Sequence, residues 1–208
     1  MKKKTPGGRL IVLEGGEGAG KSTHARFVHD WLARNGRQVV LTREPGGSPL
    51  AEAIREVVLR RWEEGMGPTT ELLLMFAARA AHLRDTILPA LEAGRDVVCD
   101  RFLDATYAYQ GAGRGMPDAA IDALASLVLG KLRPHLVLLL DVDPRVGMAR
   151  AQKRGAANRF DEETLAFQSR VRAAYLRRAR RSRRYAVVDA GADVGAIQRE
   201  LARVLAAL

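Results

Sequence analysis

The sequence predicts a three-layer α/β fold in which a five-stranded parallel sheet is flanked by helices on both faces. Short apolar runs alternate along the chain with longer segments of helical periodicity, which is the pattern of strand-helix-strand units. The run at 136–140 is continuously apolar, so we expect a central strand that is buried on both sides. A chain of 208 residues can bury one sizeable core, and we expect a single domain over 1–208.

Each predicted strand is a short run of aliphatic residues, and each predicted helix ends near a glycine or a basic turn. The strands are expected at 10–13, 39–41, 97–99, 136–140 and 186–188. The helices are expected at 22–34, 50–60, 70–92, 118–129, 144–154, 162–181 and 195–205. A parallel sheet of this kind binds its ligands beyond the carboxyl ends of the strands, and we therefore look for function there.

A phosphate-binding loop follows the first strand and opens the first helix. Glycines at this spacing let successive backbone N–H groups converge on a phosphate chain, and the helix adds its positive end. We expect Lys21 to neutralise the β and γ phosphates of a nucleotide and the Ser22 hydroxyl to hold Mg²⁺. The nucleotide-binding residues predicted from the motif are Gly15, Gly16, Glu17, Gly18, Ala19, Gly20, Lys21, Ser22 and Thr23.

Charged side chains follow the predicted strands at the edge where ligands bind. Asp100 and Arg101 come after the strand at 97–99, and this pair suits a hydrated Mg²⁺ and a phosphate respectively. Arg43 follows the strand at 39–41 and precedes a Glu-Pro-Gly-Gly turn, where it could clamp a second phosphate. Base rates favour a trans Glu44–Pro45 bond over a cis one. We expect these side chains to converge in space.

A basic helix end is predicted to form a mobile lid at about 150–160. Arg150, Lys153 and Arg154 share one helical face directly before the small residues of 155–158. Closing such a segment would bring positive charge to a transferring phosphoryl group and expel water.

The overall charge narrows the class of partner without deciding it. The formal net charge is +10, which suits a protein that binds polyphosphates and equally one that binds nucleic acid. Six arginines crowd the segment 177–184, but no aromatic residues are interleaved with them, which favours a solvated basic face over an RNA contact. We expect no nucleic-acid partner.

The sequence shows no sign of a membrane or of disulfide bonds. The apolar stretch after the N-terminal lysines is interrupted at Glu14, far short of a membrane span. Cys99 is the single cysteine, so no intramolecular disulfide can form. We expect a cytoplasmic protein with no membrane partner.

Six segments together resemble the thymidylate kinases, a nucleoside monophosphate kinase family of the phosphate-loop class. They are GGEGAGKST, TREPGG, LLLMFAAR, CDRF, ATYAYQGAGRG and RAQKRG, in the family's order over nearly the whole chain. The resemblance implies the fold of the P-loop NTPases and phosphorylation of thymidine monophosphate (dTMP) to the diphosphate by ATP with Mg²⁺, a step of dTTP biosynthesis. It also implies a homodimer and, from Glu17 in the loop and the basic lid, the bacterial arrangement.

The resemblance also assigns roles to individual residues. Lys21, Asp100, Arg101 and Arg154 would form the catalytic set, with Arg150 aiding Arg154 from the lid and binding ATP. Ser22 and Asp100 would hold Mg²⁺, while Arg43 and Arg101 would grip the acceptor's phosphate and Glu17 would reach the sugar 3′-hydroxyl. Thr106, Tyr109 and Gln110 would meet thymine and deoxyribose from one helical face, together with Arg79.

One position departs from the family pattern. The family commonly has a base-stacking phenylalanine four residues before the base-reading arginine, and Met75 stands there, whereas Phe76 is three residues before Arg79. Both can share a helical face with Arg79, and we predict that Phe76 stacks on the base because an aromatic ring stacks better.

The sequence distinguishes this function from three others. A kinase for another nucleoside monophosphate or small acceptor would not need the set Arg79, Thr106, Tyr109 and Gln110. A GTPase should carry an Asn-Lys-x-Asp segment, which the sequence lacks. A nucleic-acid-binding protein that uses the segment 177–184 would bind with a steep salt dependence that does not involve Lys21.

Overall fold

The computed structural model describes residues 7–153, 155, 159–160 and 163–208. Its five strands form one parallel sheet in the order β2-β3-β1-β4-β5, which confirms the predicted fold class. The strands are β1 (Leu10–Glu14), β2 (Val39–Arg43), β3 (Asp96–Asp100), β4 (Leu136–Asp141) and β5 (Tyr185–Asp189). The apolar run at 136–140 is buried throughout, as predicted, but the middle position of the sheet belongs to β1.

The helices lie where periodicity predicted them, and the segment on which Thr106, Tyr109 and Gln110 were expected to share a face is helical as well. They are α1 (Lys21–Arg34), α2 (Pro49–Leu59), α3 (Pro68–His82), α4 (Leu88–Glu92), α5 (Leu103–Thr106), α6 (Asp118–Leu129), α7 (Pro144–Lys153), α8 (Leu165–Ala179) and α9 (Val194–Ala206). Two π-helical turns, η1 (Leu83–Ile87) and η2 (Tyr107–Gly113), continue α3 and α5.

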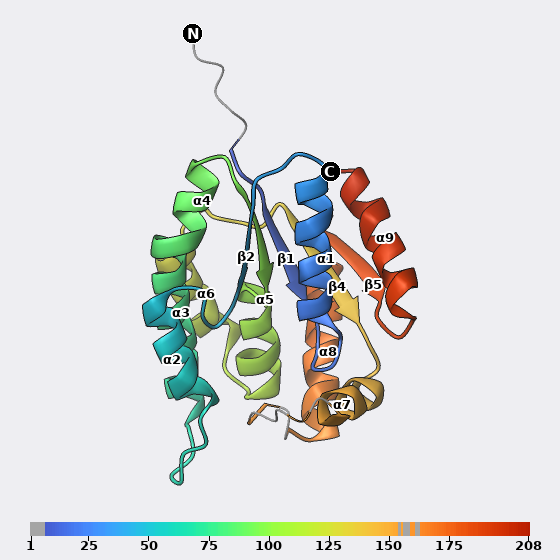
Figure 1. The fold of residues 1–208 in the computed structure, drawn as a ribbon. Helices are drawn as coiled ribbons and strands as arrows, with labels where there is room; N and C mark the ends of the chain where they lie inside the picture. The colour runs from blue at the N-terminus through green and yellow to red at the C-terminus, as the bar shows by residue number, and fades with distance from the viewer. Residues whose placement is uncertain (1–6, 154, 156–158, 161–162) are drawn as a thin grey trace.

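The helices cover both faces of the sheet (Figure 1). On one face, α1 and α9 pack on alternate residues of the strands, such as Ile11, Leu13 and Leu138. On the other face, α3, α4 and α6 pack on Leu10, Val12 and their neighbours, and α8 packs beside them on β4 and η2. The alternation of side chains along β1 thus supplies two cores, one on each side of the sheet.

The π-helical turns account for two places where the predictions were incomplete. The segment 70–92 was predicted as one helix, and it does run continuously, but η1 interrupts its α-helical hydrogen bonding just before Pro89. Proline has no N–H to donate and crowds the preceding turn, so a local change of winding is the expected response. The glycine-rich segment Gly111–Gly113 lies in η2.

Gly113 shows why this part of η2 needs small residues. A Cβ atom at Gly113 would stand 2.5 Å from the Phe167 ring of α8, which is far closer than carbon atoms can approach. The contact between η2 and α8 therefore brings backbone directly against an aromatic face.

Two local predictions were wrong. The helix predicted to start at 162 begins at Leu165, because the Thr164 side chain caps it by accepting a hydrogen bond from the Phe167 N–H. The Glu44–Pro45 bond is cis, whereas base rates favoured trans. In the part of the chain that is described, no helix is long and apolar enough to cross a membrane.

Candidate active site

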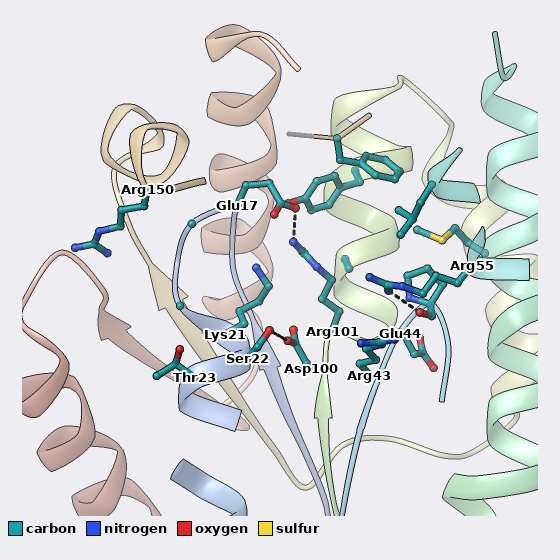
Figure 2. Close-up of a pocket in the computed structure, with 18 residues that line it drawn as sticks. Glu17, Lys21, Ser22, Thr23, Arg43, Glu44, Arg55, Asp100, Arg101 and Arg150 are labelled. Atoms are coloured by element: carbon teal, nitrogen blue, oxygen red, sulfur yellow. Dashed lines mark hydrogen bonds and ion pairs between the residues drawn. The ribbon is translucent and has the colours of Figure 1, made fainter. Parts of the chain in front are cut away.

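The predicted strand-end residues converge on one cavity of about 570 Å³. Lys21 enters it from the start of α1, Arg43 from the end of β2, and Asp100 and Arg101 from the end of β3. Figure 2 shows the amino group of Lys21 and the guanidinium of Arg101 pointing into the same space, with Arg43 beyond them. The convergence expected from the parallel topology is confirmed.

The phosphate loop takes the shape that its glycines allow. Gly15, Gly18 and Gly20 have φ values of 145°, 69° and 81°, a region that side chains disfavour. A Cβ at Gly18 would lie 1.9 Å from the carbonyl oxygen of Gly147 in α7, so the loop also needs glycine to pack against that helix. No side chain caps the N-terminus of α1 among the described residues, which leaves its first N–H groups for a phosphate.

Lys21 is almost completely buried at the floor of the cavity. Its Nζ donates a hydrogen bond of 2.7 Å to the carbonyl oxygen of Gly16, and 7% of the residue is exposed. Burial, aided by the positive charge of Arg101, lowers the pKa of the Lys21 amine to about 8. A phosphate placed here would gain a cation that has already lost its hydration shell.

Ser22 and Asp100 form the pair that was predicted to hold Mg²⁺. The Ser22 hydroxyl donates a hydrogen bond of 2.8 Å to the Asp100 carboxylate. Among the described residues no group of three or more histidine, cysteine or acidic side chains could hold a metal by itself. Two hard oxygen donors suit Mg²⁺, which usually takes one or two protein ligands and completes its shell with phosphate and water.

Arg101 is held in place by contacts with the phosphate loop and with η2. Its backbone has a φ of 69°, which is rare for a residue other than glycine. Its Nη1 donates to the Gly15 carbonyl oxygen at 3.1 Å, its Nη2 pairs with the Glu17 carboxylate, and its Cζ lies 4.9 Å from the centre of the Tyr109 ring. The guanidinium therefore links β3 to the phosphate loop.

Arg43 is half exposed and Arg55, which sequence reasoning missed, stands beside it. Arg43 pairs with Glu52 at 3.1 Å, with 55% of its side chain exposed. Arg55 in α2 lines the same cavity and donates a hydrogen bond of 2.7 Å to the Pro45 carbonyl oxygen. Burial and then the charge of Arg43 lower the pKa of Arg55. The only signal in the sequence was its place on the helix that follows the Glu-Pro-Gly-Gly turn.

Comparison with known proteins agrees with this geometry. The family model described as Thymidylate kinase matches residues 13–201. The chain belongs to the thymidylate kinase family. It is 52% identical to the thymidylate kinase of Alcanivorax borkumensis, covering 95% of this chain and 96% of that protein, and 53% identical to that of Pseudomonas entomophila, with 95% of each covered. The crystal structure of the Ehrlichia chaffeensis enzyme has a TM-score of 0.78 at 32% identity, covering 97% of this chain and 99% of that one.

A second set of predicted residues lies behind the cavity wall, next to the lining residue Glu44. Arg79 is 3% exposed; its Nε donates to Glu44 at 2.7 Å and its Nη2 donates to the Thr106 hydroxyl at 3.1 Å. Gln110 is fully buried and donates to Glu71 at 2.7 Å. Arg79 Nη1 and Gln110 Oε1 are buried polar atoms that find no hydrogen-bond partner among the described residues.

The residue expected to stack on a base is not the one that faces the cavity. Phe76 is 2% exposed and packs in the core between α3 and the sheet, with Arg79 Cζ 5.0 Å from its ring centre. Met75 lines the cavity instead. Phe76 was chosen because an aromatic ring stacks better, but the rotation of α3 about its axis decides which side chain faces the cavity. The side chain that faces it is Met75, four residues before Arg79, where the family commonly has its phenylalanine. The prediction that Phe76 stacks on the base does not fit its placement.

Tyr109 and Glu17 both line the cavity and contact each other. The Tyr109 hydroxyl donates a hydrogen bond of 3.0 Å to the Glu17 carboxylate, which is also the partner of Arg101. The Tyr109 ring meets Phe160 edge to face with ring centres 5.8 Å apart. Burial raises the pKa of Tyr109 well above its usual range, so it is a hydrogen-bond donor at neutral pH.

The basic helix end is described only in part. Arg150 lines the cavity, but its guanidinium donates to the carbonyl oxygens of Ala190 at 2.6 Å and Gly191 at 3.3 Å. Figure 2 shows it apart from the cluster around Lys21 and Arg101. Arg154, the predicted lid arginine, lies outside the described residues. The lid therefore stays a prediction.

Proposed function

We propose that this chain transfers the γ-phosphoryl group of ATP to dTMP. The observation that carries the proposal is that Lys21, Arg43 and Arg101 line one cavity, and that Arg79 lies directly behind its wall, paired with the lining residue Glu44. Arg79 Nη1 and Gln110 Oε1 are there an unpaired donor and an unpaired acceptor among the described residues. A phosphate loop at one side and a base-reading pair at the other accommodate two nucleotides with their phosphates between them. Family membership supports the same activity.

ATP would bind on the phosphate loop. The N–H groups at the start of α1 and the desolvated Lys21 would bind its β and γ phosphates, and Ser22 with Asp100 would hold Mg²⁺. The metal, when bound, neutralises charge on the phosphates. Asp100 lies beside Arg101 in sequence, so the metal side and the acceptor side of the site share one strand end.

The acceptor's phosphate would lie between Arg43 and Arg101, and we add Arg55 to this set because it lines the same wall. A monophosphate has a second pKa of about 6, so its oxygen is largely ionised at neutral pH and needs no general base. The barrier is then mainly repulsion between two anions. Fixed cations that hold the reactants in line reduce that barrier.

The base end matches thymine in its hydrogen-bonding pattern. Thymine presents a carbonyl acceptor at O4 next to an N–H donor at N3. Arg79 Nη1 offers a donor and Gln110 Oε1 an acceptor, and both lack partners among the described residues. Cytosine reverses both groups and would leave both protein atoms unsatisfied. Met75 would cover one face of the ring, and Tyr109 would crowd the place of a ribose 2′-hydroxyl.

Glu17 would meet the sugar 3′-hydroxyl from its place between Arg101 and Tyr109. Arg154, with Arg150, would stabilise the transferred phosphoryl group, a role that rests on the family resemblance alone. These assignments keep the roles predicted from the sequence, except that Met75 replaces Phe76 at the base.

We also propose that the protein is a cytoplasmic homodimer. Leu73 of α3 and Leu127 of α6 are 52% and 81% exposed on two helices that pack side by side. Exposed leucines on adjacent helices suit burial against a second copy of the chain. The buried thiol Cys99 is compatible with a reducing compartment.

A coupled ADP-release assay over dTMP, dUMP, dCMP, UMP and dGMP tests the substrate assignment. We expect the highest kcat/KM with dTMP and a large loss with dCMP, because the donor and acceptor at Arg79 and Gln110 would both face the wrong partner. A preference for a purine nucleotide would overturn the assignment of the base site.

A further inference from the structure

We propose that Tyr175 is a positioning residue, whose hydroxyl orients Arg101 toward the acceptor's phosphate by connecting it to the buried carboxylate of Glu14. The inference rests on the proposed role of Arg101. Tyr175 lies on α8, far from the phosphate loop in sequence, and no motif of the sequence points to it. Its place in the structure assigns it this role.

Glu14 is the anchor of the arrangement. It is the last residue of β1, it is fully buried, and its Oε1 accepts hydrogen bonds from the backbone N–H groups of Phe102 at 2.9 Å and Ala105 at 3.3 Å. Its Oε2 accepts the hydroxyl of Tyr175 at 2.9 Å. One carboxylate thus fixes the segment directly after Arg101 and the hydroxyl of Tyr175 together.

The direction of each hydrogen bond follows from the donors available. A guanidinium can only donate, so the contact of 3.4 Å between Arg101 Nη1 and Tyr175 Oη uses a lone pair of the hydroxyl. The hydroxyl has one proton, and it donates that proton to Glu14 when this carboxyl is ionised. Burial raises the pKa of Glu14 to about 7, so this order of hydrogen bonds dominates above pH 7. The order Arg101 to Tyr175 to Glu14 is the arrangement that satisfies all three groups.

Arg101 needs such a support because its other partners are themselves part of the site. Glu17 and the Gly15 carbonyl belong to the phosphate loop, and Glu17 is proposed to meet the substrate's sugar. When substrate binds, those contacts are shared with the ligand. Tyr175 is 2% exposed and does not line the cavity, so its contact with Arg101 does not compete with a phosphate.

The variant Tyr175→Phe removes the hydroxyl and keeps the ring, which packs in the core of α8 with its centre 6.5 Å from that of Tyr109. We expect kcat/KM for dTMP to fall about tenfold, the cost of one hydrogen bond in a charged network. The KM for ATP should change less than about twofold, because Lys21 and the loop backbone are not contacted by Tyr175.

The matched control is Tyr185→Phe. The Tyr185 hydroxyl donates a hydrogen bond of 2.6 Å to the buried carboxylate of Asp104, which also pairs with Arg178, but it does not contact Arg101. Both variants lose a hydroxyl bound to a buried carboxylate and should lower the melting temperature to a similar extent. Only Tyr175→Phe should lower kcat/KM for dTMP, and an equal loss in the control would overturn the proposal.

A double-mutant cycle with Arg101→Lys separates this inference from the function on which it rests. If Tyr175 acts through Arg101, the loss caused by Tyr175→Phe disappears in the Arg101→Lys background, whereas additive losses refute the inference. If Arg101→Lys itself leaves kcat/KM for dTMP unchanged, the proposed role of Arg101 fails. If Arg101→Lys impairs the reaction and Tyr175→Phe does not, the inference alone fails.

Glu14→Gln provides a second variant should Tyr175→Phe not fold. The amide nitrogen of glutamine would donate to Tyr175 Oη and send the hydroxyl proton toward Arg101, which cannot accept it. We expect the same selective loss of kcat/KM for dTMP. Activity equal to the parent protein in this variant would contradict the proposal.

Discussion

Binding of ATP should be coupled to the uptake of a proton by Lys21. Burial holds the pKa of this amine at about 8 in the ligand-free protein, so it loses its charge as the pH rises past 8. A triphosphate beside the amine would favour the charged form and return the pKa toward its ordinary value. Raising the pH from 7 to 9 should therefore increase the number of protons taken up when ATP binds.

The magnitude follows from the shift. With a free pKa of about 8 and a bound pKa above about 10, proton uptake per ATP is about 0.1 at pH 7, 0.5 at pH 8 and 0.9 at pH 9. The affinity for ATP should fall about tenfold between pH 7 and pH 9, because only the protonated fraction of sites binds well. Phosphates are fully ionised above pH 8 and do not add to the uptake.

Isothermal titration with MgATP, in the absence of dTMP and in buffers of different ionisation enthalpy, measures the number of protons taken up. Lys21→Arg is the control, since a guanidinium keeps its charge over this range and should abolish the uptake. Uptake that stays near zero at pH 9 in the parent protein would refute the idea that a desolvated Lys21 meets the phosphates. Equal uptake in Lys21→Arg would assign the proton to another group.

Three further predictions address separate parts of the chain. Arg154→Ala should lower turnover by about 10³ with little change in nucleotide affinity, if this arginine acts as positive fingers do elsewhere; an unchanged kcat in steady-state assays would move the role to another cation. Gln110→Glu should lower kcat/KM for dTMP and raise the ratio of kcat/KM for dCMP to that for dTMP, because a protonated carboxyl in this buried site would be a donor. The panel of monophosphates measures that ratio, and an unchanged value would show that Gln110 does not read the base. Asp96 is paired with Arg9 and Arg37, whose hydrogen bonds outweigh burial and lower its pKa to about 2. Its contribution of about 2 kcal/mol to the free energy of unfolding should be present above pH 4 and lost as the pH falls from 4 to 2. Chemical denaturation should show that the free energy of unfolding of Asp96→Asn falls less over this range than that of the parent protein.

The strands and the phosphate loop were predictable because their signals are local. Val39–Leu41 and Leu136–Leu140 are aliphatic runs typical of strands, and the structure extends each by one or two polar residues, although only Leu136–Leu140 is buried throughout. The loop from Gly15 to Thr23 carries its geometry in its glycines. Parallel topology then places the strand ends together, which is why Arg43 and Arg101 could be assigned to one cavity before any coordinates.

The parts that escaped prediction depend on contacts between distant segments. Arg55 is one of many arginines in the chain, and only its packing against Pro45 and the cavity distinguishes it. Tyr175 resembles any aromatic residue on a helix until the packing of α8 on η2 and β4 brings its hydroxyl to Glu14. The choice between Met75 and Phe76 depended on the rotation of α3 about its axis, to within one residue, which periodicity does not resolve.

A crystal structure with dTMP bound tests the central claim most directly. The account predicts the monophosphate within hydrogen-bonding distance of Arg43 and Arg101, with thymine O4 at Arg79 Nη1 and its N3–H at Gln110 Oε1. A thymine ring bound away from Arg79 and Gln110, or a phosphate that touches neither arginine, would contradict it.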